Sequence, residues 1–126
     1  MESLLKKAKE LEKKYEWLQA TECYRKATDL VLVEKHFLKA ADLHDQMGFC
    51  FHKAALQAKT NTEFKKLLKQ AIQAYEKEAK LLEEVGDENE HMKINHANAL
   101  VAYTKSWFET NPRTTKKLLD KWWTLE

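Results

Sequence analysis

Five histidines give this chain its most obvious means of holding a metal ion. His44 falls on the apolar side of an expected helix over residues 37–58, where a single histidine is typically a core residue with a hydrogen-bond partner. Asp45 and His52 share one side of that helix but lie about 10 Å apart along its axis. They therefore cannot bind the same ion directly, and they stay candidates for polar or pH-sensitive contacts.

A second pattern that could do chemistry is the Glu-x-x-His spacing of Glu88 and His91. Di-iron helical bundles need two such motifs and further glutamates that face the same interior. This chain has one copy, in the first turn of an expected helix, where acidic residues are favourable in any case. A metal-binding bundle enzyme is therefore a remote alternative, and we expect no metal and no cofactor.

The cysteines offer no nucleophilic site. Cys23 and Cys50 lie inside expected helices and have no CxxC spacing. Cys50 and His52 are two residues apart, so on a helix they do not face each other as a nucleophile and its base would. Since Gly48 and Gly86 are the two glycines of the chain, it also lacks a glycine-rich phosphate loop. We therefore expect a buried, inert Cys50, no catalytic residue and no enzyme activity.

Composition narrows the class of protein further. A length of 126 residues suggests one domain, and few glycines and prolines favour long helices with short connections. The 22 basic and 20 acidic side chains are interleaved, whereas a nucleic-acid interface needs an unbalanced basic patch. The first 14 residues are too charged for a signal peptide, and the longest aliphatic run, residues 30–33, is too short to span a membrane. We expect a cytoplasmic protein.

The element that should organise all others is the helix over residues 37–58. At 100° per residue its apolar side chains cover most of the helix circumference, and the polar ones form a narrow wedge. A helix that is apolar on most sides must be covered on most sides. We therefore place it at the centre of an all-α domain. Gly48 indicates that another helix approaches closely there, or that the helix bends.

The remaining apolar spacing predicts five more helices, over about residues 3–13, 17–30, 60–85, 87–108 and from 111 onward. Their start and stop signals are a capping box of Thr60 with Glu63, helix termination at Gly86, a cap at Asp87, and Asn111-Pro112. No glycine or proline marks the turns near residues 14–16 and 33–36, and one long kinked helix is the alternative at the second. Expected buried faces include Tyr15 and Leu30, whereas Glu76, Lys77, Glu78 and Lys80 are assigned to an outer face.

The first two helices resemble a tetratricopeptide repeat. Leu4, Ala8 and Leu11 supply a large, small, large pattern, and Trp17, Ala20, Tyr24 and Ala27 supply an aromatic, small, aromatic, small pattern at the family spacing. The similar segments KATDL at 26–30 and KAADL at 39–43 fit helices made from similar parts. The match covers about a quarter of the chain. Lys7 stands where the family has leucine, and the 34-residue period finds Ala54, Ala58 and Asn61, without the aromatic. The longer later helices are closer to the SNAP-like adaptor proteins.

The resemblance implies a right-handed superhelix of about six antiparallel helices in stacked hairpins, with a compact up-down bundle as the alternative. It also implies a non-catalytic scaffold or adaptor that binds a protein or peptide in a helical groove. Carried over by position, Leu5, Lys9, Glu12 and Lys13 would face that groove. The other interpretation is that they are ordinary exposed residues of a terminal helix.

The final helix raises a second structural hypothesis. Adjacent tryptophans on a helix point about 100° apart, so either Trp122 or Trp123 would be exposed if nothing followed. On this hypothesis the domain is the terminal module of a longer helical-repeat protein, and it self-associates through the end that carries the two tryptophans. A natural short helix is the alternative.

Overall fold

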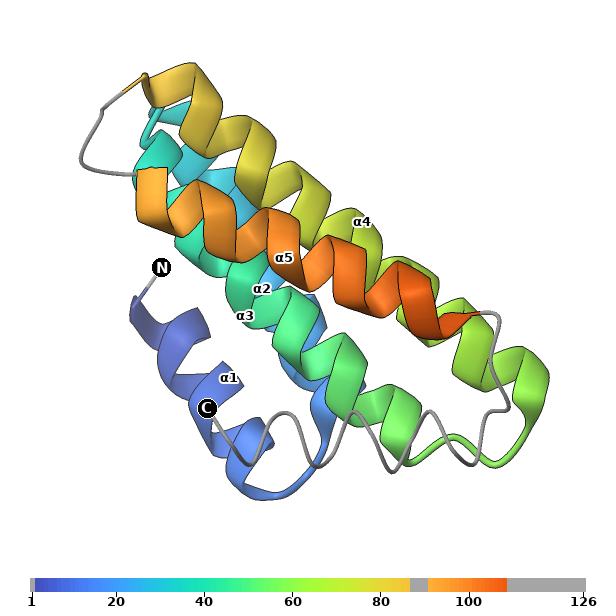
Figure 1. Cartoon of the computed structure of the whole chain (residues 1–126). Coiled ribbons are helices and arrows are strands. Elements are labelled where there is room, and N and C mark those ends of the chain that lie inside the picture. Colours follow the sequence, from blue (N-terminus) through green and yellow to red (C-terminus); the bar gives the residue numbers. More distant parts are fainter. Residues whose placement is uncertain (1, 87–90, 109–126) are drawn as a thin grey trace.

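The computed structural model describes residues 2–86 and 91–108 of the chain. Five helices occupy these residues: α1 (Glu2–Lys13), α2 (Trp17–Val33), α3 (Phe37–Leu56), α4 (Asn61–Val85) and α5 (His91–Phe108). They run alternately up and down (Figure 1), and no strand occurs within the described ranges. The prediction of an all-α protein is confirmed.

Two finer predictions about the fold stay open. The tetratricopeptide-like superhelix and the up-down bundle both fit five antiparallel helices, so the choice between them stays a prediction. The expected sixth helix beginning at Asn111-Pro112 lies outside the described residues, as do the cap at Asp87 and the pair Trp122 and Trp123.

The helix α3 lies at the centre of the described fold, as expected. It packs against both α2 and α4, and half of its twenty residues are buried. Phe51 packs against all three clusters of buried apolar side chains: one among α1–α3 that also includes Ala74 of α4, one between α3 and α4, and one formed by α4 and α5. The helix ends at Leu56 rather than at the expected residue 58.

Gly48 of α3 lets α4 approach closely, as predicted. A Cβ atom on Gly48 would lie 2.5 Å from Cε1 of Tyr75, well inside ordinary contact distance. The Tyr75 ring is fully buried, and its hydroxyl group lies 3.2 Å from Nδ1 of His52. The aromatic ring therefore lies directly on the α3 backbone and has a hydrogen bond that holds it there.

The two unmarked turns share one conformation. Tyr15 and Lys35 each adopt a left-handed backbone, with φ of 61° and 59°. Each turn makes the two hydrogen bonds of a Schellman motif, normally closed by glycine: Glu16 N to Leu11 O and Tyr15 N to Glu12 O in the first, His36 N to Val31 O and Lys35 N to Leu32 O in the second. The predicted turns are confirmed, and the alternative of one long kinked helix is wrong.

These turns belong to a structural repeat of 20 residues. Residues 11–24 and 31–44 have the same order of buried, half-buried and exposed side chains. Trp17 corresponds to Phe37 and Ala20 to Ala40. The similar segments at 26–30 and 39–43, by contrast, are 13 residues apart and do not occupy equivalent positions in the fold.

The ends of α4 follow the predicted signals. Thr60 Oγ1 accepts a hydrogen bond from Glu63 N at 3.1 Å, and Gly86 ends the helix with φ of 67°. Three predictions of burial are wrong. Tyr15 is 69% exposed because it forms the turn, Leu30 is 50% exposed, and Glu78 is buried at 4% exposure because α3 and α5 cover it.

Candidate functional site

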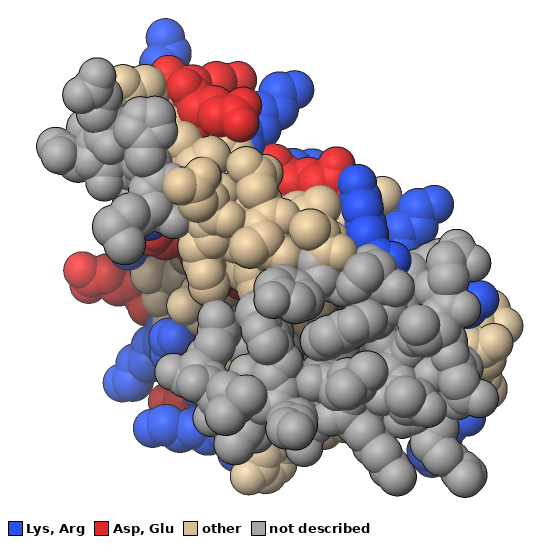
Figure 2. Space-filling model, in the orientation of Figure 1, with Lys and Arg blue, Asp and Glu red and all other residues tan. Residues whose placement is uncertain are grey.

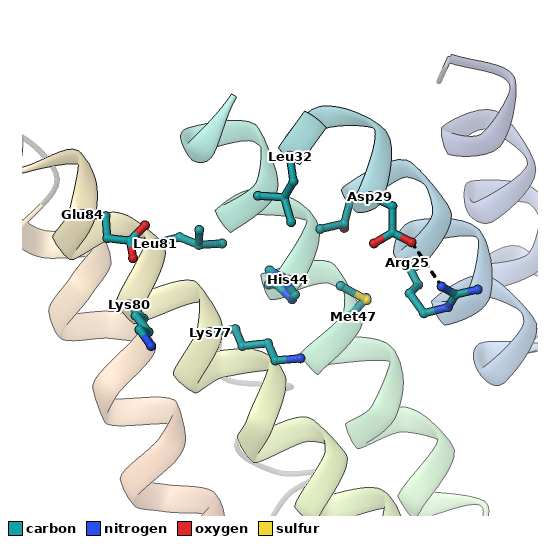
Figure 3. A pocket seen from close by; sticks show the side chains of 10 residues that line it. Arg25, Asp29, Leu32, His44, Met47, Lys77, Lys80, Leu81 and Glu84 are labelled. Atoms are coloured by element: carbon teal, nitrogen blue, oxygen red, sulfur yellow. Dashed lines mark hydrogen bonds and ion pairs between the residues drawn. The ribbon is translucent and has the colours of Figure 1, made fainter. Parts of the chain in front are cut away.

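A hollow in the described surface lies between α2 and α4. Both helices pack on α3 but have little direct contact with each other. The space left between them has a volume of about 430 Å³ and is floored by His44 and Met47 of α3 (Figure 3). An adjoining hollow of about 220 Å³ shares these two residues and continues to Phe51. We call the two together the α2–α4 groove.

The groove is long rather than round. Its lining runs from Thr21 to Leu32 along α2 and from Gln70 to Glu84 along α4. At 1.5 Å per residue these spans are about 17 and 21 Å. Such a length matches an extended element of a partner better than a compact small molecule.

The floor of the groove is apolar and adaptable. Met47 and Phe51 line it from below, while Leu32 and Leu81 line it from the two walls. Methionine has three rotatable bonds and a polarizable sulfur, so it can adjust to differently shaped apolar groups. The floor can therefore receive apolar side chains without needing one fixed shape.

His44 is the polar residue of this floor. It is 8% exposed, and burial, followed by the nearby charge of Lys77, lowers its pKa to about 4, against an opposing effect of Asp29. The imidazole is therefore neutral at pH 7. Within the described part of the chain, Nδ1 has no hydrogen-bond partner. His44 is a core residue as expected, but among the described residues Nδ1 lacks the hydrogen-bond partner that was expected.

The charged rims of the groove differ from each other. On α2, Arg25 forms ion pairs with Glu22 and with Asp29, the latter at 3.2 Å. On α4, neither Lys77 nor Lys80 forms an ion pair with any described residue. The α2 rim therefore carries one basic and two acidic side chains, whereas the α4 rim carries Lys77 and Lys80 with one acidic side chain, Glu84. Elsewhere basic and acidic side chains are interleaved, as the face in Figure 2 shows.

The residues predicted from the family resemblance divide into two kinds. Lys9 and Lys13 are exposed on α1, where a partner could reach them, although Lys9 also forms an ion pair with Glu12 at 3.5 Å. Leu5 is half-buried and packs against the cluster among α1–α3. Glu12 is 13% exposed, and its Oε2 accepts a hydrogen bond from the Tyr24 hydroxyl group at 2.7 Å. The structure therefore gives Leu5 and Glu12 contacts within the protein itself.

Glu12 also reaches the central helix. The Cys50 thiol donates a hydrogen bond to Glu12 Oε1 at 3.5 Å. Cys50 is fully buried, and burial, followed by the charge of Glu12, raises the pKa of its thiol. The expected inert Cys50 fits this geometry, and Glu12 joins α1 to both α2 and α3.

The other predicted polar residues that the structure describes do not form a metal site. His52 is fully buried, and burial lowers its pKa to about 3. Asp45 lies instead beside Glu78, 33 residues away in the sequence. Throughout residues 2–86 and the described side chains of α5, no three His, Cys, Asp or Glu residues are placed to hold a metal ion. Glu88 and the side chain of His91 lie outside the described part.

Comparison of the chain with protein-family models, with curated proteins and with solved structures finds no match. Among the described helices, none has an apolar stretch long enough to cross a membrane. Sequence reasoning missed the α2–α4 groove, because no local signal shows that α2 and α4 stay apart when both pack on α3.

Proposed function

We propose that this protein is a non-catalytic interaction module that binds an amphipathic helix of a partner protein in the α2–α4 groove. The observation that supports the proposal is the shape of the groove. A length of about 17 to 21 Å corresponds to a helix of about 11 to 14 residues. Helix-in-groove recognition places apolar anchors at i, i+3, i+4 and i+7 on such a floor.

The charges on the rims define the partner further. Lys77 and Lys80 outnumber Glu84 on the α4 rim, whereas Arg25 on the α2 rim is already paired with two carboxylates, so the attraction for an acidic partner comes mainly from the α4 rim. We infer a partner helix with acidic residues along the flank that faces α4. The affinity would come from a few apolar anchors on the Met47 floor, and the rim charges would favour this orientation over others.

A helical peptide library with four apolar anchor positions and randomised flanks tests the proposal. Peptides selected on the wild-type protein should carry glutamate or aspartate on one flank. Fluorescence anisotropy should show that Lys77→Glu with Lys80→Glu weakens the selected peptide about tenfold, since two surface attractions of up to ~1 kcal/mol each are reversed. Met47→Asp should weaken it at least as much, because it places a charge on the apolar floor.

The matched control is Lys9→Glu with Lys13→Glu, which makes the same charge change on α1. Its affinity for the selected peptide should equal that of the wild type. If this control loses binding and the α4 variant keeps it, the partner binds the α1 surface that the tetratricopeptide resemblance indicates. If selection enriches no peptide that depends on Met47, the groove is not a helix-binding site.

A further inference from the structure

A second hollow of about 240 Å³, between α3, α4 and α5, is lined entirely by ionisable side chains. Asp42 and Asp45 come from α3, Glu78 from α4, and Lys93 and His96 from α5. These ionisable groups come from three helices and line one hollow. Their placement indicates a role in the packing of α3, α4 and α5. The groove proposed above makes no use of them.

Glu78 is the unusual member of this group. It is 4% exposed, and its Oε1 has no hydrogen-bond partner among the described residues. Its carboxyl group lies within hydrogen-bonding reach of Asp45. Two carboxylates in contact at a buried position cannot both stay ionised at low cost, because like charges repel and burial disfavours each charge. One shared proton removes both penalties and supplies a hydrogen bond between the groups.

We propose that Asp45 and Glu78 hold one proton between them at neutral pH, and that this proton fastens α4 to α3 beside α5. The protein then takes up a proton when these helices close together. It releases that proton whenever α4 separates from α3.

The surrounding charges assign the proton to Glu78. Burial, together with the charge and hydrogen bond of Asp45 and the charge of Asp42, raises the pKa of Glu78 to about 9 against the opposing charge of Lys93. Burial also raises the pKa of Asp45, but the hydrogen bond with Glu78 and the nearby His96 favour its ionised form. Glu78 is therefore the donor, and Asp45 is the accepting carboxylate.

The consequence for stability has a definite sign. In the unfolded chain Glu78 has its ordinary pKa of 4.5 and is ionised at pH 7, whereas in the folded protein it is protonated. The stabilisation is therefore complete below about pH 4.5 and is lost as the pH rises toward 9. For one proton, the unfolding equilibrium constant increases by up to tenfold for each pH unit in that range.

Urea unfolding between pH 7 and 9 tests the proposal, because His44 and His52 are neutral in the folded protein throughout this window and mostly neutral in the unfolded chain. Because Glu78 is half titrated at pH 9, its proton alone should increase the wild-type unfolding constant about fiftyfold across this window. Glu78→Gln keeps an amide donor toward Asp45 but cannot ionise, so its unfolding constant should change several-fold at most. Glu83→Gln, an exposed position on the same helix, is the matched control and should keep the wild-type slope. Equal slopes for Glu78→Gln and the wild type would overturn the proposal.

A second measurement needs no variant. In wild-type protein labelled with ¹³C in the glutamate carboxyl groups, one resonance should keep the chemical shift of a protonated acid at pH 7 and titrate near pH 9. If every glutamate carboxyl group titrates below pH 6, Glu78 is ionised at neutral pH and the proposal is wrong, whether or not Glu78→Gln folds.

Discussion

The Tyr75 ring makes two contacts that fix its position. Its face covers the backbone at Gly48, and its hydroxyl group is bonded to the buried His52. The ring therefore cannot move away from α3 without breaking that hydrogen bond. This is the reason why the glycine in the middle of α3 is needed, although glycine costs a helix about 1 kcal/mol relative to alanine.

Gly48→Ala should consequently destabilise the protein. The added methyl group would lie 2.5 Å from the Tyr75 ring, and overpacking of this kind costs about 1–3 kcal/mol, which exceeds the gain in helix propensity. We expect a net loss of up to about 2 kcal/mol in the free energy of urea unfolding. Lys39→Ala, at an exposed position of the same helix, should change it by less than about 0.5 kcal/mol. A more stable Gly48→Ala protein would show that the ring can shift.

Sequence reasoning at this scale succeeds where one residue carries the signal. Gly48 indicated a close approach, and the structure shows one. Glu78 was assigned to the outer face because glutamate is rarely buried, although it lies three residues after Tyr75 and four before Leu82 on the apolar stripe. The spacing of Glu78 along the helix could therefore have indicated its burial. The contact between Glu78 and Asp45 could not be predicted from the sequence, because only the packing of two helices brings residues 33 apart into contact.

Helix boundaries were predictable where the chain uses ordinary signals. Thr60 and Gly86 mark the ends of α4 in the sequence and in the structure. The turns at Tyr15 and Lys35 were expected although neither contains a glycine or proline. In each turn a residue other than glycine occupies the left-handed position, so the usual sequence signal is missing. The 20-residue spacing of Trp17 and Phe37 could have supported the prediction of both turns. The cost of these left-handed residues is offset by the packing of the helices they join.

Lys35→Gly should therefore stabilise the protein. An L-residue in the left-handed region costs about 1–2 kcal/mol, whereas the extra freedom of glycine in the unfolded chain costs about 0.5–1 kcal/mol. We expect a gain of about 0.5–1 kcal/mol in urea unfolding. Lys26→Gly, an exposed position within α2, should have the opposite sign and lose about 1 kcal/mol. A loss at position 35 would contradict the left-handed turn.

At the scale of the whole molecule, the buried ionisable groups oppose each other. His44 and His52 have lowered pKa values of about 4 and 3, against 6.5 in the unfolded chain. Their stabilisation is complete above about pH 6.5 and is lost as the pH falls toward 4. Glu78, whose pKa is raised to about 9, acts in the other direction and loses its stabilisation as the pH rises.

Stability should therefore pass through a maximum near pH 6.5. There the two histidines, each half protonated in the unfolded chain, balance the one proton that Glu78 binds in the folded protein. Near pH 5.5 we expect a slope of about 1 kcal/mol per pH unit, measured by urea unfolding. His44→Leu should remove much of the loss on the acidic side, whereas His36→Gln, at an exposed position, should leave it unchanged. A steady rise in stability toward pH 5 would contradict the assignment of neutral, buried histidines.

The overall class of this molecule followed from its sequence, since helical periodicity and the scarcity of glycine and proline leave few alternatives to an all-α fold. The α2–α4 groove did not, because it depends on the angle at which two helices cross a third. The residues carried over from the tetratricopeptide resemblance show the same limit, since Glu12 matches the family position but contacts Tyr24 and Cys50 of this chain.

The position of Glu12 above Cys50 has a chemical consequence. As long as α1 stays in place, the sulfur is covered and a neighbouring negative charge suppresses its ionisation. Detachment of α1 would remove the cover and the charge together and turn an unreactive thiol into a nucleophile. The rate at which an alkylating reagent consumes this sulfur would then record how often the amino-terminal helix leaves the body of the protein.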